Sequence, residues 1–123
     1  MNKEAKKTVI IGATENPSRY ANRAAHSLVR YGHAIELVGL RPGQINGQPI
    51  HTGQPALTDV DTVTMYVGPQ NQPGLYAYIK SLKPRRVIFN PGTENPEFEE
   101  QLRAEGIEPV EGCTLVMLSI GTY

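Results

Sequence analysis

Val9-Ile10-Ile11-Gly12-Ala13-Thr14-Glu15-Asn16-Pro17-Ser18-Arg19-Tyr20 decides the fold of this chain, because an apolar strand runs here into a small, polar loop and then into a helix. β-Branched residues favour a buried strand, and a glycine at its end lets the backbone turn without a Cβ clash. Free N–H groups at the start of the following helix can point at an anion. The segment therefore predicts a nucleotide-type ligand, with a tight strand-to-helix turn without a ligand as the alternative.

The loop differs from the common dinucleotide fingerprint, because Thr14 and Pro17 occupy the second and third glycine positions. The end of the second predicted strand, Gly39-Leu40-Arg41-Pro42, has no carboxylate that could accept hydrogen bonds from a ribose. It offers instead an arginine, whose guanidinium matches phosphate oxygens. This turn favours a phosphorylated ribose, as in NADP or coenzyme A (CoA), over NAD. The alternative is that Arg41 is a solvated turn residue.

The rest of the chain alternates between strand and helix patterns. Apolar runs predict strands at 8–11, 34–40, 61–67 and 85–90. Helical spacing predicts helices at 19–31, 73–83 and 95–105, the last starting at Asn95-Pro96 and closed by Gly106, after which 107–111 is the last strand. Residues 41–53 are rich in Gly, Pro and Asn, which indicates a loop with room for a short edge strand. The alternation predicts an α/β fold, a Rossmann-like three-layer αβα arrangement with a mostly parallel five-stranded sheet.

Length and charge narrow the class of protein. A chain of 123 residues predicts a single domain over 1–123. Lys plus Arg and Asp plus Glu number 12 each, so we expect no nucleic-acid partner. The charges are segregated, with four arginines and one glutamate in 18–41, so an anionic ligand would prefer that region. The single Cys113, the lack of a signal-like apolar run after the first residues and the lack of a long apolar stretch predict a cytoplasmic protein without a membrane span.

Several further stretches carry a family resemblance. Besides the opening segment they are Gly32-His33 before the second strand, Ile45-Asn46-Gly47-Gln48-Pro49-Ile50 after it, and Asn90-Pro91-Gly92-Thr93. With them the chain resembles the small stand-alone CoA-binding domain proteins, which are similar to the CoA-binding domain of the succinyl-CoA synthetase α subunit. The resemblance covers nearly the whole chain. It implies that the chain binds CoA or an acyl-CoA in a groove at the carboxyl edge of the sheet.

The resemblance also implies which residues meet the ligand. The diphosphate would lie against the first loop, at Gly12, Ala13, Thr14, Asn16, Ser18, Arg19 and Tyr20. The adenosine and its 3′-phosphate would lie against Arg41 and Pro42, and the adenine and pantetheine against Val67, Gly68 and Pro69. The loop that closes over the ligand would be Asn90, Pro91, Gly92 and Thr93. Many relatives carry Asn-Pro where this chain has Leu40-Arg41-Pro42, which leaves the 3′-phosphate contacts open.

The chain lacks the phosphorylated-histidine domain and the ATP-grasp partner of the synthetases, so the resemblance implies a binding module without chemistry of its own. One alternative is a thiol-dependent acyl-CoA or CoA-disulfide enzyme that uses Cys113, a residue that could equally be buried packing. Another alternative is an NADP-responsive sensor. The apolar tail from Leu115 onward either covers the sheet or forms a self-association patch, and hence a homodimer.

The remaining polar residues point to no second site. His26, His33 and His51 have no partner at metal-ligand spacing, so we expect no metal and take them as solvated or capping residues. The pair Arg85-Arg86 is expected to open its strand in solvent.

Overall fold

The structure of the protein, a computed structural model, describes residues 4–123. The strands are β1 (Thr8–Ile11), β2 (Ile35–Val38), β3 (Gly43–Ile45), β4 (Gln48–His51), β5 (Thr62–Met65), β6 (Arg86–Phe89) and β7 (Glu108–Glu111). The α-helices are α1 (Tyr20–Arg30), α2 (Tyr76–Ser81), α3 (Pro96–Ala104) and α4 (Thr114–Ile120), and two short 3₁₀ turns, η1 (Pro69–Asn71) and η2 (Pro73–Leu75), precede α2.

The sheet has seven strands in the order β3-β4-β2-β1-β5-β6-β7. All neighbouring pairs are parallel except β3 with β4. Without β3, the strands follow the order of the doubly wound nucleotide-binding folds, which reverses direction between β1 and β5. The predicted α/β, mostly parallel and Rossmann-like fold is confirmed, but the prediction of five strands is wrong.

The two additional strands form a hairpin within residues 41–53. Asn46 and Gly47 have φ angles of 52° and 81°, so both turn residues adopt the left-handed region that a two-residue hairpin loop requires. Each strand is short and mostly polar, and Pro49 interrupts the second, so alternation of apolar residues is weak. The two strands form nevertheless, because β4 pairs in parallel with β2, with Ile50 opposite Leu37.

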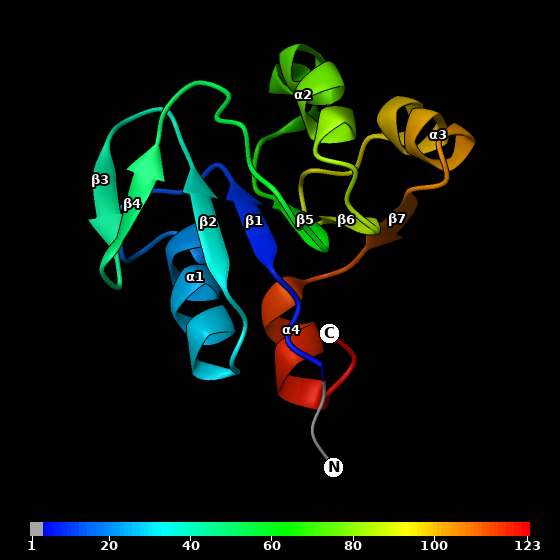
Figure 1. Cartoon of the computed structure of the whole chain (residues 1–123). Coiled ribbons are helices and arrows are strands. Elements are labelled where there is room, and N and C mark those ends of the chain that lie inside the picture. The colour runs from blue at the N-terminus through cyan, green and yellow to red at the C-terminus, as the bar shows by residue number, and fades with distance from the viewer. Residues whose placement is uncertain (1–3) are drawn as a thin grey trace.

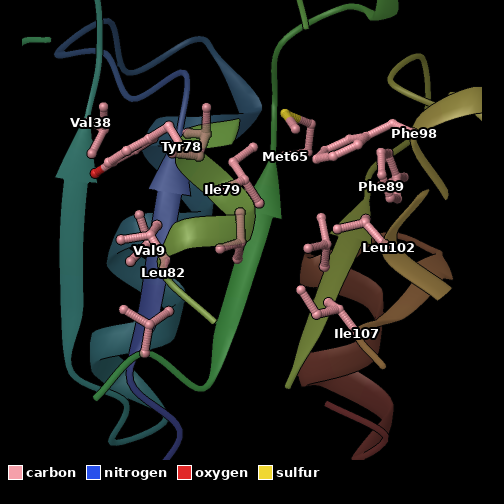
Figure 2. Packing of buried hydrophobic residues seen from close by; sticks show 14 residues of the cluster. Val9, Val38, Met65, Tyr78, Ile79, Leu82, Phe89, Phe98, Leu102 and Ile107 are labelled. Atoms are coloured by element: carbon pink, nitrogen blue, oxygen red, sulfur yellow. The ribbon is translucent and has the colours of Figure 1, made fainter. Parts of the chain in front are cut away.

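Helices cover both faces of the sheet: α1 and α4 lie on one side, and α2 and α3 on the other (Figure 1). The side chains of β1 alternate between the two cores, since Val9 and Ile11 join the cluster under α2 and α3, whereas Ile10 joins the cluster under α1. Figure 2 shows the first cluster, in which Ile79 of α2 and Phe98 of α3 pack against the strands. Burial on both faces explains why β1 is apolar at each position.

The apolar tail forms a helix, which the sequence pattern did not predict. Leu118 of α4 and the following Tyr123 are buried in the cluster with α1, while Val116 and Ile120 are exposed. The tail therefore covers the sheet, one of the two outcomes expected for it. Among residues 4–123, no helix has the length and apolar character needed to cross a bilayer.

Arg86, expected in solvent, and His33, expected to be solvated or capping, are both buried, so the expectation of a solvated side chain is wrong for both. His33 and Arg86 are 9% and 6% exposed. The His33 ring lies 4.8 Å from the Tyr123 ring, and the Arg86 guanidinium lies 4.5 Å from the centre of the same ring. Arg86 Nε also donates to Thr62 Oγ1 at 2.9 Å. Both are buried because Tyr123 folds back over the amino ends of the strands, where its hydroxyl bonds that of Thr8.

The burial of His33 predicts that the fold loses stability in mild acid. Burial, followed by the positive charges of Lys6 and Arg86, holds the pKa of His33 below its ordinary value of 6.5, and the opposing effect of Asp61 is smaller. Neutral His33 accepts a hydrogen bond at Nδ1 from the Lys6 amide, 2.9 Å away. The unfolded chain binds the proton first, so stability is full above pH 6.5 and falls as the pH drops toward the lowered pKa.

The measurement is the urea midpoint at about pH 7.5 and about pH 5.5. The His33→Gln variant should lose less stability than the wild type between these values, and the exposed His26→Gln should behave as the wild type does. Equal losses in wild type and His33→Gln would contradict the assignment.

Candidate functional site

The candidate site lies where the strand order reverses. After β1 the chain passes to α1 on one face of the sheet, and after the neighbouring β5 it passes to α2 on the other face (Figure 1). Loops that leave adjacent strands in opposite directions open a crevice beyond the carboxyl ends of those strands, and ligands of open α/β sheets bind there. The loops that follow β1, β2, β5, β6 and β7 all belong to this edge.

Three strands approach closely at the first loop. The amides of Gly12 and Ala13 both donate to Val38 O, at 2.9 and 3.0 Å. Gly12 has φ of +98°, and a Cβ built on it would lie 3.1 Å from the Tyr66 carbonyl carbon. A side chain at this position would therefore strain the backbone and press on β5. Gly12 therefore allows the first loop to lie close against the ends of β2 and β5.

The polar residues of the first loop shape one another. Asn16 Oδ1 accepts hydrogen bonds from the Ser18 amide at 3.0 Å and the Ser18 hydroxyl at 2.8 Å. Thr14 Oγ1 accepts from the Asn16 amide at 3.2 Å, and Asn22 Nδ2 donates to Thr14 O at 2.9 Å. Arg19, which follows Ser18 and directly precedes α1, makes no side-chain hydrogen bond to the first amides of the helix. The first turn of α1 has no acidic residue. The loop thus presents a helix start whose positive end suits an anion.

Positive charge gathers at this end of the molecule. Arg19 and Arg41 are exposed, as are Tyr20 and Pro42 beside them. The Arg23 guanidinium lies 5.4 Å from the centre of the Tyr20 ring. The one acid of the first loop, Glu15, is engaged by β3, since the Gln44 amide donates to its Oε2 at 2.9 Å. The predicted segregation of charge therefore places arginines around the predicted ligand loops.

The loop after β6 divides into exposed and buried parts. Pro91 and Gly92 are exposed, and the neighbouring loop residues Val67, Gly68 and Pro69 are partly exposed. Asn90 and Thr93 are only 2% and 5% exposed. Their side chains therefore point into the protein and are not open to a ligand beside the loop.

The side chain of Asn90 joins three elements. Its Nδ2 donates to Thr64 Oγ1 at 2.7 Å and to Met65 O at 2.9 Å, and its Oδ1 accepts from the Thr114 amide at 2.9 Å. Both of its N–H groups are thus used inside the protein. The residue is placed to hold β5, β6 and α4 together beneath the site.

Cys113 is half-buried and directly precedes α4 at the same edge of the sheet. Tyr66 lies nearby at the end of β5. Burial raises the pKa of Tyr66, Thr114 opposes this effect in part, and Cys113 adds a smaller increase. The Tyr66 phenol therefore stays protonated at neutral pH.

Two cavities lie elsewhere. One of about 440 Å³ is formed by residues of the 54–57 connection and of α2, and one of about 420 Å³ lies around His33, the end of α4 and Tyr123. None of the predicted ligand residues lines either. Within the described residues 4–123, no three His, Cys, Asp or Glu side chains gather where they could hold a metal ion.

Two buried residues behind the loops were not among the predicted ligand residues. Gln72 is 0% exposed and Asn95 is 7% exposed. The sequence marks Asn95 as the cap of a helix, and its Oδ1 indeed accepts from the Phe98 amide at 3.2 Å. Nothing in the local sequence marks Gln72, because two of its three partners lie on the loop after β6.

The strand order and the small, polar loop at the reversal point define a Rossmann-like α/β domain. The chain belongs to the CoA binding domain family, whose model matches residues 6–119. This confirms the family resemblance found in the sequence.

Solved structures share the fold of this chain. A crystal structure described as that of an uncharacterized protein is 55% identical, with a TM-score of 0.96, and the match covers 98% of this chain and 100% of that one. A Thermus thermophilus protein, cell-free ID.343, is 23% identical with a TM-score of 0.85 over 97% of this chain and 91% of that one. A hypothetical protein from Pyrococcus horikoshii OT3 is 19% identical with a TM-score of 0.85, over 94% and 83%. The last two show the shared fold. No curated protein matches the chain.

Proposed function

We propose that this chain is a cytoplasmic module that binds CoA or an acyl-CoA along the carboxyl edge of its sheet and performs no chemistry of its own. The observation that carries the proposal is the position of the 12–20 loop at the reversal of strand order in a member of the CoA binding domain family. The arginines around that loop supply the charge that a ligand with three phosphate groups needs.

In the proposed complex the diphosphate lies over the first loop. Gly12 and Ala13 are small and leave room beside the loop, but their amides are bonded to Val38 O, so the N–H groups and the positive charge come from the start of α1. Ser18 and Arg19 lie exposed beside that helix start. Arg41, exposed on the turn after β2, takes the 3′-phosphate, and the loops 67–69 and 91–93 flank the rest of the ligand.

The proposal is tested by thermal-shift titration of the purified protein with CoA, dephospho-CoA and NADP. A ligand that binds only the folded state stabilises it by about 2.7 kcal/mol at a hundredfold excess over its dissociation constant. We expect CoA to raise the melting temperature more than either other ligand. An NADP shift larger than the CoA shift would favour a sensor of that nucleotide, and no shift with any CoA form would overturn the proposal.

The Arg41→Ala variant is expected to bind CoA about tenfold more weakly, because it loses a charge-assisted contact to the 3′-phosphate. Its affinity for dephospho-CoA, which lacks that phosphate, should be unchanged. Titration calorimetry with the two ligands measures the difference. The control is Arg30→Ala, which removes an exposed arginine from the far end of α1. Equal weakening for both ligands would show that Arg41 does not contact the 3′-phosphate.

A further inference from the structure

Gln72 occupies a buried position between two of the loops that border the site. Its Nε2 donates to Val67 O at 2.9 Å and to Thr93 O at 2.8 Å. Its Oε1 accepts from Asn95 Nδ2 at 2.9 Å. One side chain thus connects the loop after β5 with the loop after β6, and with 0% exposure it does so out of contact with water.

The third partner of Gln72 is itself held firmly. The main-chain N–H of Asn95 donates to Glu99 Oε2 at 3.1 Å, and the side-chain Nδ2 of Asn95 also donates to the Tyr76 hydroxyl at 2.8 Å. Tyr76 begins α2, and its ring stacks on Phe98 of α3 with 4.2 Å between the ring centres. The connection between the two loops is therefore anchored to the first turns of both helices.

The geometry asks for a primary amide at position 72. Two backbone carbonyls face Nε2, so the side chain must supply two N–H donors, and Asn95 requires an acceptor on the same group. A carboxylate of the same shape would face both carbonyls without a proton to donate. An apolar side chain would leave the buried Thr93 carbonyl and the partly buried Val67 carbonyl without this partner.

We propose that Gln72 is the positioning residue of the ligand site, which fixes the spacing between the loops 67–69 and 91–93. This inference rests on the proposed function, since those loops are the ones that would flank the pantetheine arm. Gln72 does not touch the ligand. It holds the Val67 and Thr93 carbonyls at one separation before the ligand arrives, so that binding does not have to order the two loops.

The test compares Gln72→Met, which keeps the length of the side chain, with Gln70→Met, the same change at an exposed position of the same loop. We expect Gln72→Met to bind CoA about tenfold more weakly, because two hydrogen bonds that hold the loops are lost. Its affinity for adenosine 3′,5′-bisphosphate, which lacks the pantetheine arm, should fall much less. Gln70→Met should bind both ligands as the wild type does.

A purely structural role would weaken both ligands alike, so equal losses for CoA and the fragment, or no loss, would overturn the inference. Gln72→Glu supplies a second measurement if Gln72→Met does not fold. Protonation returns one donor to its carboxyl group, so its CoA affinity relative to the fragment should rise as the pH is lowered. No such rise in the variant, or the same rise in the wild type, would also overturn it.

Amide hydrogen exchange separates this inference from the proposed function. If wild-type protein does not bind CoA, the proposed function fails, but the link between the loops can still be measured in the ligand-free protein. Gln72→Met should then speed exchange of the Thr93 amide, which donates to Asn90 O at 2.9 Å, whereas Gln70→Met should not. Unchanged exchange in Gln72→Met would show that Gln72 does not fix the loop.

Discussion

Gly39→Ala is expected to lower the free energy of unfolding by about 3 kcal/mol, at the upper end of what overpacking costs. A Cβ at position 39 would lie 2.3 Å from Ala13 O and 3.1 Å from Ile50 Cγ2. The first contact is with the backbone of Ala13, whose amide already donates to Val38 O of β2. Neither the first loop nor the end of β2 can therefore move without breaking this bond to the sheet. Because no positive φ is involved, the whole effect is steric. Urea unfolding of the ligand-free protein measures it.

Gly74→Ala is the matched control for this prediction. A Cβ at position 74 would meet nothing within 4 Å, so its effect should stay within about 0.5 kcal/mol. If Gly39→Ala were as stable as Gly74→Ala, the end of β2 and the first loop would have to be free to separate. In that case the close approach of Gly39 to the first loop would not be fixed as the structure shows it.

Asn90→Ala is expected to destabilise the ligand-free protein by about 3 kcal/mol, because each buried polar group that loses its partner costs about 1–3 kcal/mol. The change would leave the Met65 carbonyl and the Thr114 amide without the Asn90 side chain. Denaturant unfolding without ligand measures the loss. Asn71→Ala, at an exposed position in η1, should have little effect.

The stability of Asn90→Ala, measured together with its CoA binding, distinguishes two roles for Asn90. The family resemblance places it among the residues that meet the ligand, whereas its hydrogen bonds place it beneath the site. If Asn90→Ala kept its stability but lost CoA binding, the residue would act as a ligand contact. Loss of stability without ligand would mean that it supports the loop that carries Pro91 and Gly92.

The sequence predicts the parts of this fold that local patterns determine. The five predicted strands are present, and burial on both faces explains the apolar residues of β1, β5 and β6. The β3–β4 hairpin depends on pairing with β2, and the only local signal for it was Asn46-Gly47. Strands whose stability comes from a distant partner leave little trace in their own residues.

The site divides in the same way. The placement of the first loop and of Arg41 at one edge follows from parallel strands and could be predicted. The burial of Asn90 and the bonds of Gln72 could not, because Asn90 bonds Thr64, 26 residues away, and Gln72 bonds Thr93, 21 residues away. His33 and Arg86 are buried by Tyr123, far along the chain, and nothing near them in the sequence indicates that.

The two margins of the sheet bear on how copies of this chain meet. At one margin the Gln44 amide, which an added strand would need, is already occupied by Glu15. At the other margin, β7, the main-chain N–H of Glu108 points inward and donates to Arg85 O. The next residue along the strand would point its N–H outward, but it is Pro109, which has none. Neither margin presents the open row of donors that templates aggregation. Crowded or partly stressed solutions of this protein should therefore resist growth of intermolecular sheets.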